Sequence, residues 1–382
     1  MEQFVVLREE GRYNAFPILE QLPDGRLVIG CVSSPVGDHM GMGDWPVLVS
    51  DDRGATWSPS RDPGLPPNWP GSTPREKYDR LCRIMPDGSF LAVGSLGYEL
   101  WDSDRRAEAE ARGLSIYDHD PIIARQLPGH LVVSGHRLVV IRSRDRGASW
   151  ERRTWTVPGY KAVTGFPRGT VLEDGTWLFP VYTGRSDGGG DGLIFRSEDG
   201  GATWRLHLAV PRLCNEWALV EVAPGRILGH IRWGSRWGHP EDDRIYALEV
   251  WSEDGGKTWT HPIEASFQGY PNHLLRLRDG RILCTFGYRR KPMGVRALIS
   301  ENMGNSWDLD REYVLRDDAG TASSAWPAEK RFQPGFGSSD VGYPISTELE
   351  DGSILTAYYI TPPDATTQVA VTRWHPDRDR PA

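Results

Sequence analysis

The sequence predicts an all-β fold, a six-bladed β-propeller with four antiparallel strands in each blade. Two observations lead to this prediction. An eight-residue motif, Ser-x-Asp-x-Gly-x-Thr-Trp, recurs five times, and six tight turns, most of them Asp-Gly, lie between short apolar runs. A repeat that returns at a period of 20–50 residues indicates a repeat architecture. Repeats of about four short strands arranged around an axis form a propeller.

The eight-residue motif, called the Asp box below, marks one turn in each repeat. The tryptophans of the first two boxes are separated by close to two repeat periods, so we infer that one repeat has lost its box. The fifth copy is degraded, with Asn302 in place of the aspartate and Ser306 in place of the threonine. We expect the Ser, Asp and Gly of each box to fix a turn between outer strands and the Trp to pack beneath it. The five copies are Ser50–Trp57, Ser143–Trp150, Ser197–Trp204, Ser252–Trp259 and Ser300–Trp307.

A tight turn precedes each place where a box is expected. Asp-Gly between alternating apolar runs is a strong hairpin signal. One segment, Asp104 to Arg112, has the composition of a helix and lies in the long second repeat, where the box is missing. The six turns are Pro23–Gly25, Pro86–Gly88, Glu173–Gly175, Ala223–Gly225, Arg278–Gly280 and Glu350–Gly352.

The repeats divide the whole chain, 1–382, into one domain of six blades. The early apolar run from Phe4 to Leu7 is expected to pair with the last blade and close the ring, which removes an open sheet edge. The predicted blades are 12–66, 75–155, 160–208, 213–264, 268–330 and 340–376.

Composition narrows the classes of function. The net charge is -8, which disfavours a nucleic-acid partner. The start of the chain has no signal peptide and no apolar run long enough to cross a membrane, so the sequence favours the cytoplasm, or secretion if a signal was removed. No metal or cofactor motif is found, and none is expected. The four cysteines form no Cys-x-x-Cys pair and are expected to be buried thiols, at Cys31, Cys82, Cys214 and Cys284.

The turns also give a register for finding a site. In a propeller the first strand of each blade lines the central channel, so residues at the same distance before each turn glycine face a common pocket. Asp79, Glu216 and Tyr343 share this register, and we expect them to converge; the alternative is that each is a solvated strand end. The residues nine positions before the turn glycines are Phe16, Asp79, Phe166, Glu216, Pro271 and Tyr343.

Across nearly the whole chain the sequence resembles the sialidase and BNR-repeat superfamily. The segment from Asn215 to Glu221 resembles the segment of the family that carries its glutamate, and Arg232 matches the second of the family's three substrate-binding arginines. Tyr343, in Gly342–Ser346, matches the nucleophile. The resemblance implies that Glu216 takes the proton of Tyr343, which then attacks the anomeric carbon of a sugar.

For the third arginine and the general acid/base of the family pattern, the sequence offers more than one candidate. The third arginine is expected before the fifth box, with Arg290 the best candidate and Arg289 and Arg296 its rivals. The general acid/base is expected on a first-blade loop, at Asp38 or alternatively Asp44.

The first family arginine is missing. Ala15 stands at its place in Tyr13–Pro17, and Arg12 is three residues out of register. The resemblance therefore implies a sialidase-like glycoside hydrolase that cleaves a terminal sugar, but not a true sialidase. A uronate or another acidic or neutral sugar is the expected substrate.

The chemistry of such a site is coherent. A free tyrosine has a pKa of about 10, so it needs a neighbouring base to act as a nucleophile at neutral pH. A neutral nucleophile also avoids repelling an anionic sugar, a repulsion of about 1–4 kcal/mol for two charges about 4 Å apart.

Two other functions remain open. His273 or His119 is a candidate base for a lyase that acts on a uronate-containing glycan together with Tyr and Arg. A propeller that binds glycans without catalysis is the third hypothesis. Loop tryptophans are candidates to stack on sugar rings, with Trp233 and Trp237 weighted highest, ahead of Trp45, Trp69 and Trp101.

Overall fold

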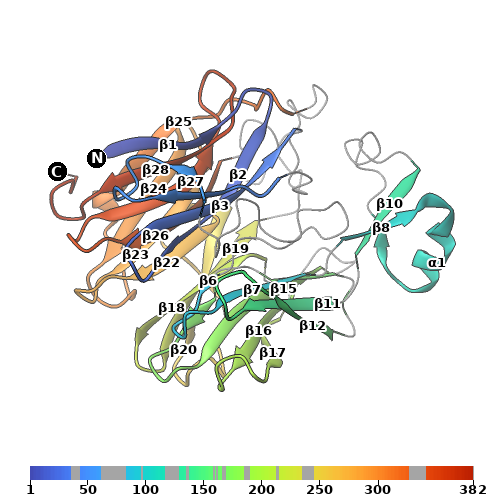
Figure 1. Ribbon diagram of the computed structural model, residues 1–382. Coiled ribbons are helices and arrows are strands. Elements are labelled where there is room, and N and C mark those ends of the chain that lie inside the picture. The colour runs from blue at the N-terminus through green and yellow to red at the C-terminus, as the bar shows by residue number, and fades with distance from the viewer. Residues whose placement is uncertain are drawn as a thin grey trace.

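The computed structural model contains six antiparallel sheets arranged around a central axis (Figure 1). The fold is a six-bladed β-propeller with four-stranded blades, as predicted. The structure describes residues 1–35, 44–61, 83–95, 98–116, 129–134, 137–157, 160, 162–165, 169–184, 190–211, 215–234, 245–326 and 341–381.

The first three blades contain the N-terminal half of the chain. Blade 1 consists of β2 (Tyr13–Gln21), β3 (Leu27–Ser34), β4 (Val47–Ser50) and β5 (Ser58–Pro59). Blade 2 consists of β6 (Arg83–Ile84), β7 (Phe90–Ser95), β11 (Arg137–Ser143) and β12 (Glu151–Thr156). Blade 3 has its inner strand in two pieces, and consists of β13 (Ala162–Gly165), β14 (Thr170–Val171), β15 (Trp177–Gly184), β16 (Gly192–Ser197) and β17 (Arg205–Val210).

The other three blades complete the ring. Blade 4 consists of β18 (Trp217–Ala223), β19 (Arg226–Gly234), β20 (Ile245–Ser252) and β21 (Ile263–Glu264). Blade 5 consists of β22 (Asn272–Arg276), β23 (Ile282–Tyr288), β24 (Met293–Ser300) and β25 (Tyr313–Ala319), with η2 (Leu309–Arg311) before β25. Blade 6 consists of β26 (Gly342–Glu348), β27 (Ile354–Ile360), β28 (Gln368–Trp374) and β1 (Glu2–Arg8).

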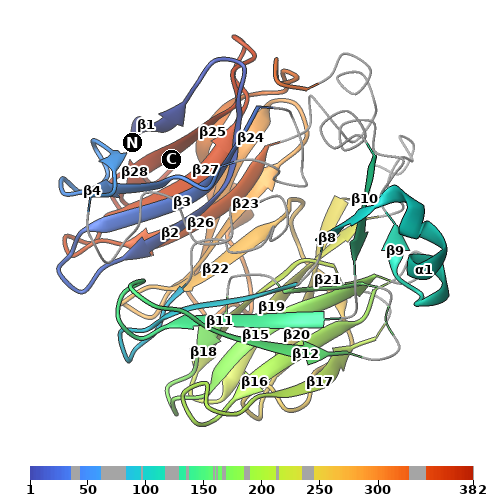
Figure 2. The ribbon, with the colours of Figure 1, turned by 45° about the vertical axis from the view of Figure 1, so that its right-hand side comes forward.

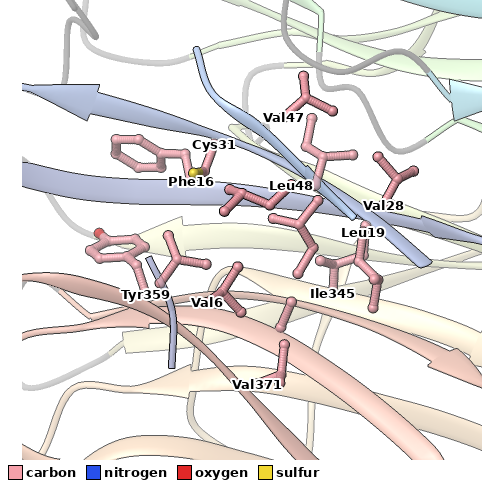
Figure 3. Packing of buried hydrophobic residues seen from close by; sticks show 14 of the residues in the cluster. Val6, Phe16, Leu19, Val28, Cys31, Val47, Leu48, Ile345, Tyr359 and Val371 are labelled. Carbon is pink, nitrogen blue, oxygen red and sulfur yellow. The ribbon is translucent and has the colours of Figure 1, made fainter. Parts of the chain in front are cut away.

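The N-terminal strand closes the ring. β1 pairs antiparallel with β28, with Phe4 opposite Val371, which confirms the closure expected from the sequence. The N-terminal ammonium group lies 2.9 Å from the Asp379 carboxylate, so the two ends of the chain meet in blade 6 (Figure 1). Side chains from blades 1 and 6, including Leu19, Leu48 and Ile345, pack together at this junction (Figure 3).

Blade 2 carries an insertion between its second and third strands. β8 (Tyr98–Asp102), β10 (His130–Ser134) and β9 (Ser115–Ile116) form a separate sheet, with η1 (Ser103–Arg105) and α1 (Arg106–Ala111) beside it. The helix expected from Asp104 to Arg112 is therefore present. The insertion stands out from the propeller (Figure 2) and has a small core of its own, formed by Trp101, Ala109, Leu131 and Val133.

The Asp boxes act as structural turns. In the third box the Ser197 hydroxyl accepts a hydrogen bond from Gly201 N at 2.8 Å, and Asp199 accepts two bonds from Thr203. The bonds from Thr203 lower the pKa of the Asp199 carboxyl to about 2. Trp204 donates its indole N–H to the carbonyl of Gly201 at 3.1 Å. The box is thus held together by bonds among its own residues.

Arginines join some boxes to the preceding blade. Arg142, the last residue before the second box, donates to the carbonyl of Gly200 in the third box at 2.7 Å. Arg196, at the same place in the next repeat, donates to the carbonyl of Gly255 in the fourth box. Both arginine side chains are less than a tenth exposed, so each bond links two blades in a largely water-free setting.

Two of the four cysteines lie among the described residues. Cys31 and Cys284 are buried free thiols, whereas Cys82 and Cys214 lie outside the described residues. Within the described ranges no helix is long and apolar enough to cross a membrane, and no three His, Cys, Asp or Glu side chains gather as a metal site requires.

Candidate active site

The propeller has two different faces. The Asp-Gly turns and the Asp boxes lie at one end of the blades, called the box face below. First strands begin, and second strands end, at the opposite end, called the site face. Glu216 directly precedes β18, Tyr343 is in β26, and Arg232 is in β19. The antiparallel order of the strands therefore brings these three side chains to the site face.

A tyrosine and a glutamate from blades 6 and 4 meet there. The Tyr343 hydroxyl donates to Glu216 Oε1 at 2.6 Å. Arg232 Nη1 lies 2.6 Å from Glu216 Oε2 and 3.2 Å from Tyr343 Oη. Glu216 and Arg232 are also joined by a backbone bond between adjacent strands. The three side chains form one buried hydrogen-bonded unit, with Tyr343 only 7% exposed.

The surroundings fix the protonation of this unit. Burial alone would raise the pKa of Glu216, but the charge of Arg232 and the hydroxyl of Tyr343 outweigh it, and the pKa is lowered. Burial, reinforced by the negative charge of Glu216, raises the pKa of Tyr343 well above its ordinary value. The resting site therefore holds an ionised carboxylate and a neutral phenol.

A second arginine faces the same unit. Arg289, just after β23, donates from Nε to the carbonyl of Val341 at 3.1 Å. Its charge helps to lower the pKa of Glu216. Its Nη2 is buried and has no hydrogen-bond partner among the residues that the structure describes. A buried guanidinium nitrogen without a partner is costly unless an anion satisfies it, so this side of the site fits an acidic ligand.

Tyr270 lies against both arginines. Its ring centre is 4.4 Å from the Arg232 guanidinium and 5.1 Å from that of Arg289. The segment is held closely, because a Cβ at Gly287 would come within 2.8 Å of the Tyr270 carbonyl oxygen and 3.1 Å of the Gly342 Cα. The absence of a side chain at Gly287 thus allows its backbone to pack closely against the backbone at Tyr270 and at Gly342.

Phe16 occupies in blade 1 the register that Tyr343 occupies in blade 6. Both precede a proline, and both have positive φ angles, 55° and 50°. Their rings meet edge to face with centroids 4.9 Å apart, and Tyr359 packs against both. An apolar wall therefore flanks the tyrosine on the side where the family pattern places its first arginine.

Arg12 is occupied elsewhere. Its guanidinium bonds the Ser33 hydroxyl at 2.8 Å and the Asp44 carboxylate at 2.7 Å. Asp44 also exchanges two backbone bonds with Ser33. Ala15, at the place of the missing arginine, is fully buried. Arg12 would have to release these bonds to reach a ligand.

Other sequence candidates lie away from the tyrosine–glutamate pair or outside the described residues. Arg296 is buried in blade 5, where it donates to the carbonyls of Arg316 and Pro292. His273 accepts a hydrogen bond from Ser346 N through Nδ1 at 3.2 Å. Arg290 follows Arg289 and is partly buried. The residues outside the described part are Asp38, Asp79, His119, Trp69, Trp237 and the side chain of Trp233.

Two of the expected sugar-stacking residues are packed inside the protein. Trp45 and Trp101 are each 5% exposed, and Arg105 covers the Trp101 ring at 3.9 Å. The expectation that these two rings face a sugar is therefore wrong.

The register counted from the turn glycines did not indicate Tyr270. The register rule identified its neighbour, Pro271, and the Tyr-Pro pair was the available signal, since Phe16 and Tyr343 also precede prolines.

A cavity of about 380 Å³ follows the channel toward the box face. All six inner strands contribute to its lining. Burial raises the pKa of Glu20 there to about 7, although Arg83 opposes the shift. Glu173 and Arg276 form an ion pair at 2.6 Å in the same lining.

Comparison with known proteins places the chain in a family. A model of the BNR repeat-like domain matches residues 128–356, more than half of the chain. The chain belongs to the BNR repeat-like family. It is 30% identical over 149 residues to a sialidase of Bacteroides fragilis, a match that covers 36% of this chain and 25% of that protein. The chain thus matches only about a quarter of the length of this curated relative.

Solved structures share the fold of this BNR repeat-like protein. A Dyadobacter fermentans protein of unknown function is 24% identical, with a TM-score of 0.74 over 98% of each chain. A Hadza microbial sialidase is 18% identical, with a TM-score of 0.58 over 95% of this chain and 66% of that one. The NanB sialidase of Streptococcus pneumoniae is 15% identical, with a TM-score of 0.57 over 99% of this chain and 71% of that one. These likenesses show the sialidase-type propeller fold.

Proposed function

We propose that this chain is a glycoside hydrolase that releases a terminal acidic sugar, with Tyr343 as the nucleophile and Glu216 as its base. The main support is the 2.6 Å hydrogen bond from the Tyr343 hydroxyl to the buried Glu216 carboxylate. An adjacent base is what a weak hydroxyl nucleophile requires, and sialidases are the glycosidases that use a tyrosine. The likeness to proteins named as sialidases supports a glycan substrate.

In the proposed first step the Tyr343 oxygen forms a bond to the anomeric carbon while the glycosidic C–O bond breaks. The phenol proton passes to Glu216 Oε1. An acid protonates the departing oxygen. The same group then takes a proton from water, whose oxygen bonds to the anomeric carbon as the sugar–tyrosine bond breaks, and Glu216 returns its proton to the Tyr343 oxygen. We assign this acid to Asp38, because Asp44, the alternative, is engaged by Arg12.

Binding of an acidic group would make Glu216 a stronger base. In the resting site, Arg232 and Arg289 both lower the pKa of Glu216. An anion placed between the two guanidinium groups offsets part of their positive field, so the pKa of Glu216 rises as the substrate binds. Proton transfer from Tyr343 then becomes easier in the complex than in the free enzyme.

The charges of the described site favour one negative charge on the ligand. Arg232 and Arg289 contribute two positive charges, and Glu216 contributes one negative charge. The family pattern has three arginines, but here Ala15 and the wall of Phe16 replace the first. We therefore propose a carboxylate sugar other than the ordinary sialic acids, such as a uronate, as the substrate class.

The substitution Tyr343→Phe tests this proposal. It removes the nucleophilic oxygen while keeping the ring that packs against Phe16, so the fold should be retained. We expect a loss of at least about 1,000-fold in kcat on a substrate found by screening aryl glycosides of acidic and neutral sugars, since covalent catalysis needs this oxygen.

The control is Tyr358→Phe, a buried tyrosine of β27 whose hydroxyl contacts Thr372. It should leave turnover unchanged. Turnover by Tyr343→Phe at the wild-type rate would refute the assignment. Mass spectrometry of protein quenched during turnover of a fluorinated sugar should locate the adduct on Tyr343.

A further inference from the structure

The ring of Tyr270 lies against two like charges. Arg232 and Arg289 approach it at 4.4 Å and 5.1 Å. Two guanidinium groups held close together repel each other, and this repulsion is stronger in a partly buried site than in water. The negative face of an aromatic ring attracts cations. Tyr270 thus stabilises a pair of arginines that would otherwise move apart.

The Tyr270 backbone is tied to the strand that leads to Arg289. Tyr270 N donates to the carbonyl of Gly287 at 3.0 Å, and Gly287 N donates back to the carbonyl of Pro271 at 3.4 Å. Arg289 follows Gly287 by two residues. The ring and the second arginine therefore share one short backbone pairing, which fixes their relative positions.

A buried polar cluster contacts the segment that directly follows Tyr270. Asn272 Nδ2 lies 3.1 Å from His230 Nδ1, and His230 Nε2 lies 3.3 Å from Glu249 Oε1. Trp307 of the fifth box donates its indole N–H to Glu249 Oε1 at 3.1 Å. His230 is 1% exposed. This chain of contacts reaches from the fifth box to the residue two positions after Tyr270.

The fold itself does not require these polar groups. The positions equivalent to His230, five residues after the turn glycine, are Gly30, Val93, Pro180, Thr285 and Ala357. The positions equivalent to Glu249, three residues before the box serine, are Val47, Val140, Ile194 and Ala297. The other blades thus fold without charged or imidazole side chains at these positions. The cluster in blade 4 is therefore best explained by what it positions.

We propose that Tyr270 is a positioning residue that holds Arg232 and Arg289 at the spacing of one carboxylate, and that the His230–Glu249 cluster keeps Tyr270 in place. The inference rests on the proposed function for its substrate class, an acidic sugar. It adds a residue that acts through the arginines and not on the reacting bond. The ligand group that it serves is a single carboxylate.

The test measures binding by calorimetry, with glucuronate and galacturonate as probes and their methyl esters as uncharged counterparts. Tyr270→Leu removes the ring, and Tyr270→Phe keeps it. We expect Tyr270→Leu to weaken acid binding roughly tenfold and ester binding hardly at all, because an aromatic contact to a partly desolvated cation is worth about 1–2 kcal/mol. Tyr270→Phe should stay within about threefold of wild type.

A matched control is Trp251→Leu. Trp251 and Arg226 both belong to blade 4, and the Arg226 guanidinium lies 4.5 Å from the centre of the Trp251 ring. Trp251, however, lies next to the fourth box on the box face. Its loss should leave the ratio of acid to ester affinity unchanged. Thermal unfolding of each variant shows whether the fold persists, and Tyr270→Ile serves as a second variant without the ring if Tyr270→Leu does not fold.

The outcomes separate this inference from the proposed function. Equal weakening of acid and ester by Tyr270→Leu would overturn it, because the ring would then contact the sugar itself. Failure of both acids to bind the wild type would also overturn it, even if Tyr343-dependent hydrolysis of another sugar were found. Selective acid binding that depends on Tyr270 would support it even in a protein with no hydrolysis, a result that refutes only the proposed function.

Discussion

The first four Asp boxes and the fifth differ in where the closing tryptophan donates its indole N–H. In the first four it bonds the carbonyl of the box glycine, at 3.0–3.2 Å. In the fifth, Trp307 bonds Glu249 of the neighbouring blade at 3.1 Å. The regular boxes keep their bonds inside the turn, whereas the fifth contributes one to a cluster that reaches the candidate site.

This difference shows that a repeated turn can give up one of its own hydrogen bonds and bond a neighbouring blade instead. The degraded box still folds, because Asn302 accepts hydrogen bonds from Ser300 and from Ser306 N in place of the aspartate, and the Ser300 hydroxyl still accepts from Gly304 N. The tryptophan bond is redirected, and the side-chain bond to the seventh residue is reversed, with Asn302 Nδ2 donating to the Ser306 hydroxyl at 2.8 Å. Changes at regular boxes should therefore affect stability alone, and loss of the Trp307 bond in the fifth box should also affect the site.

The largest effect is expected where a regular box joins two blades. Arg142→Met removes the buried guanidinium that donates to Ser89, to the carbonyl of Gly200 and to the exposed carboxylate of Asp87. We expect a loss of about 2–4 kcal/mol in the free energy of unfolding, since three hydrogen bonds are lost at about 1 kcal/mol each and solvent screens the charge left on Asp87. Denaturant titration measures it. Ligand binding by the folded fraction should be unchanged, and a changed affinity would contradict the separation of the two faces.

The pH dependence should differ between a box carboxyl and the channel carboxyl. Asp199, whose pKa is lowered to about 2, contributes stability above its ordinary pKa that is lost as the pH falls toward 2. Glu20, whose pKa is raised to about 7, should make the protein less stable as the pH rises, because its ionised form is disfavoured in the folded state.

Glu20→Gln tests the channel half of this contrast. The wild type should lose stability as the pH rises from about 4.5 through 7, and the variant should not. We expect the variant to be more stable by about 1–3 kcal/mol at pH 8 and equal at pH 4.5, as followed by urea unfolding at each pH. A difference that is constant with pH would show that Glu20 is ionised throughout.

A pair of tryptophan variants tests the comparison most directly. Trp204→Phe loses a bond within its box and should cost about 0.5–1.5 kcal/mol of stability, with the acid-to-ester affinity ratio unchanged. Trp307→Phe removes a donor from the partly buried Glu249 and should cost about 1–3 kcal/mol. It should also lower the affinity ratio. If both variants leave the ratio unchanged, the fifth box does not support the site.

The smallest effect is expected from restoring the fifth box. Asn302→Asp regains a charged acceptor for Ser306, and we expect a gain of up to about 1 kcal/mol, because the turn is exposed to solvent. The Trp307 bond to Glu249 should persist, so ligand affinity should not change. Chemical denaturation gives the first quantity and calorimetry the second.

The sequence allowed the architecture and the central pair of the site to be predicted, because both depend on local signals that repeat. Turn glycines set the register of each inner strand, and this register brings Glu216 and Tyr343 together across the channel. The pairing of Phe4 with the last blade followed from the need to cover an edge.

Other parts of the site depend on geometry that no local signal carries. Strand alternation ends with β23 at Tyr288, so counting along the strand did not decide whether Arg289 or Arg290 turns inward. Tyr270 was missed because the register rule selected Pro271. The His230–Glu249 cluster joins residues that are close only after two blades pack together.

The closure of the ring by β1 has a consequence for how the molecule is oriented when it is attached to something else. Met1 and Asp379 meet at 2.9 Å, and Arg373 at the end of β28 bonds the carbonyl of Arg53 in the first box. Both ends of the chain thus leave from the box face. Immobilisation through either end would hold the propeller with Tyr343 directed away from the support and toward the solution.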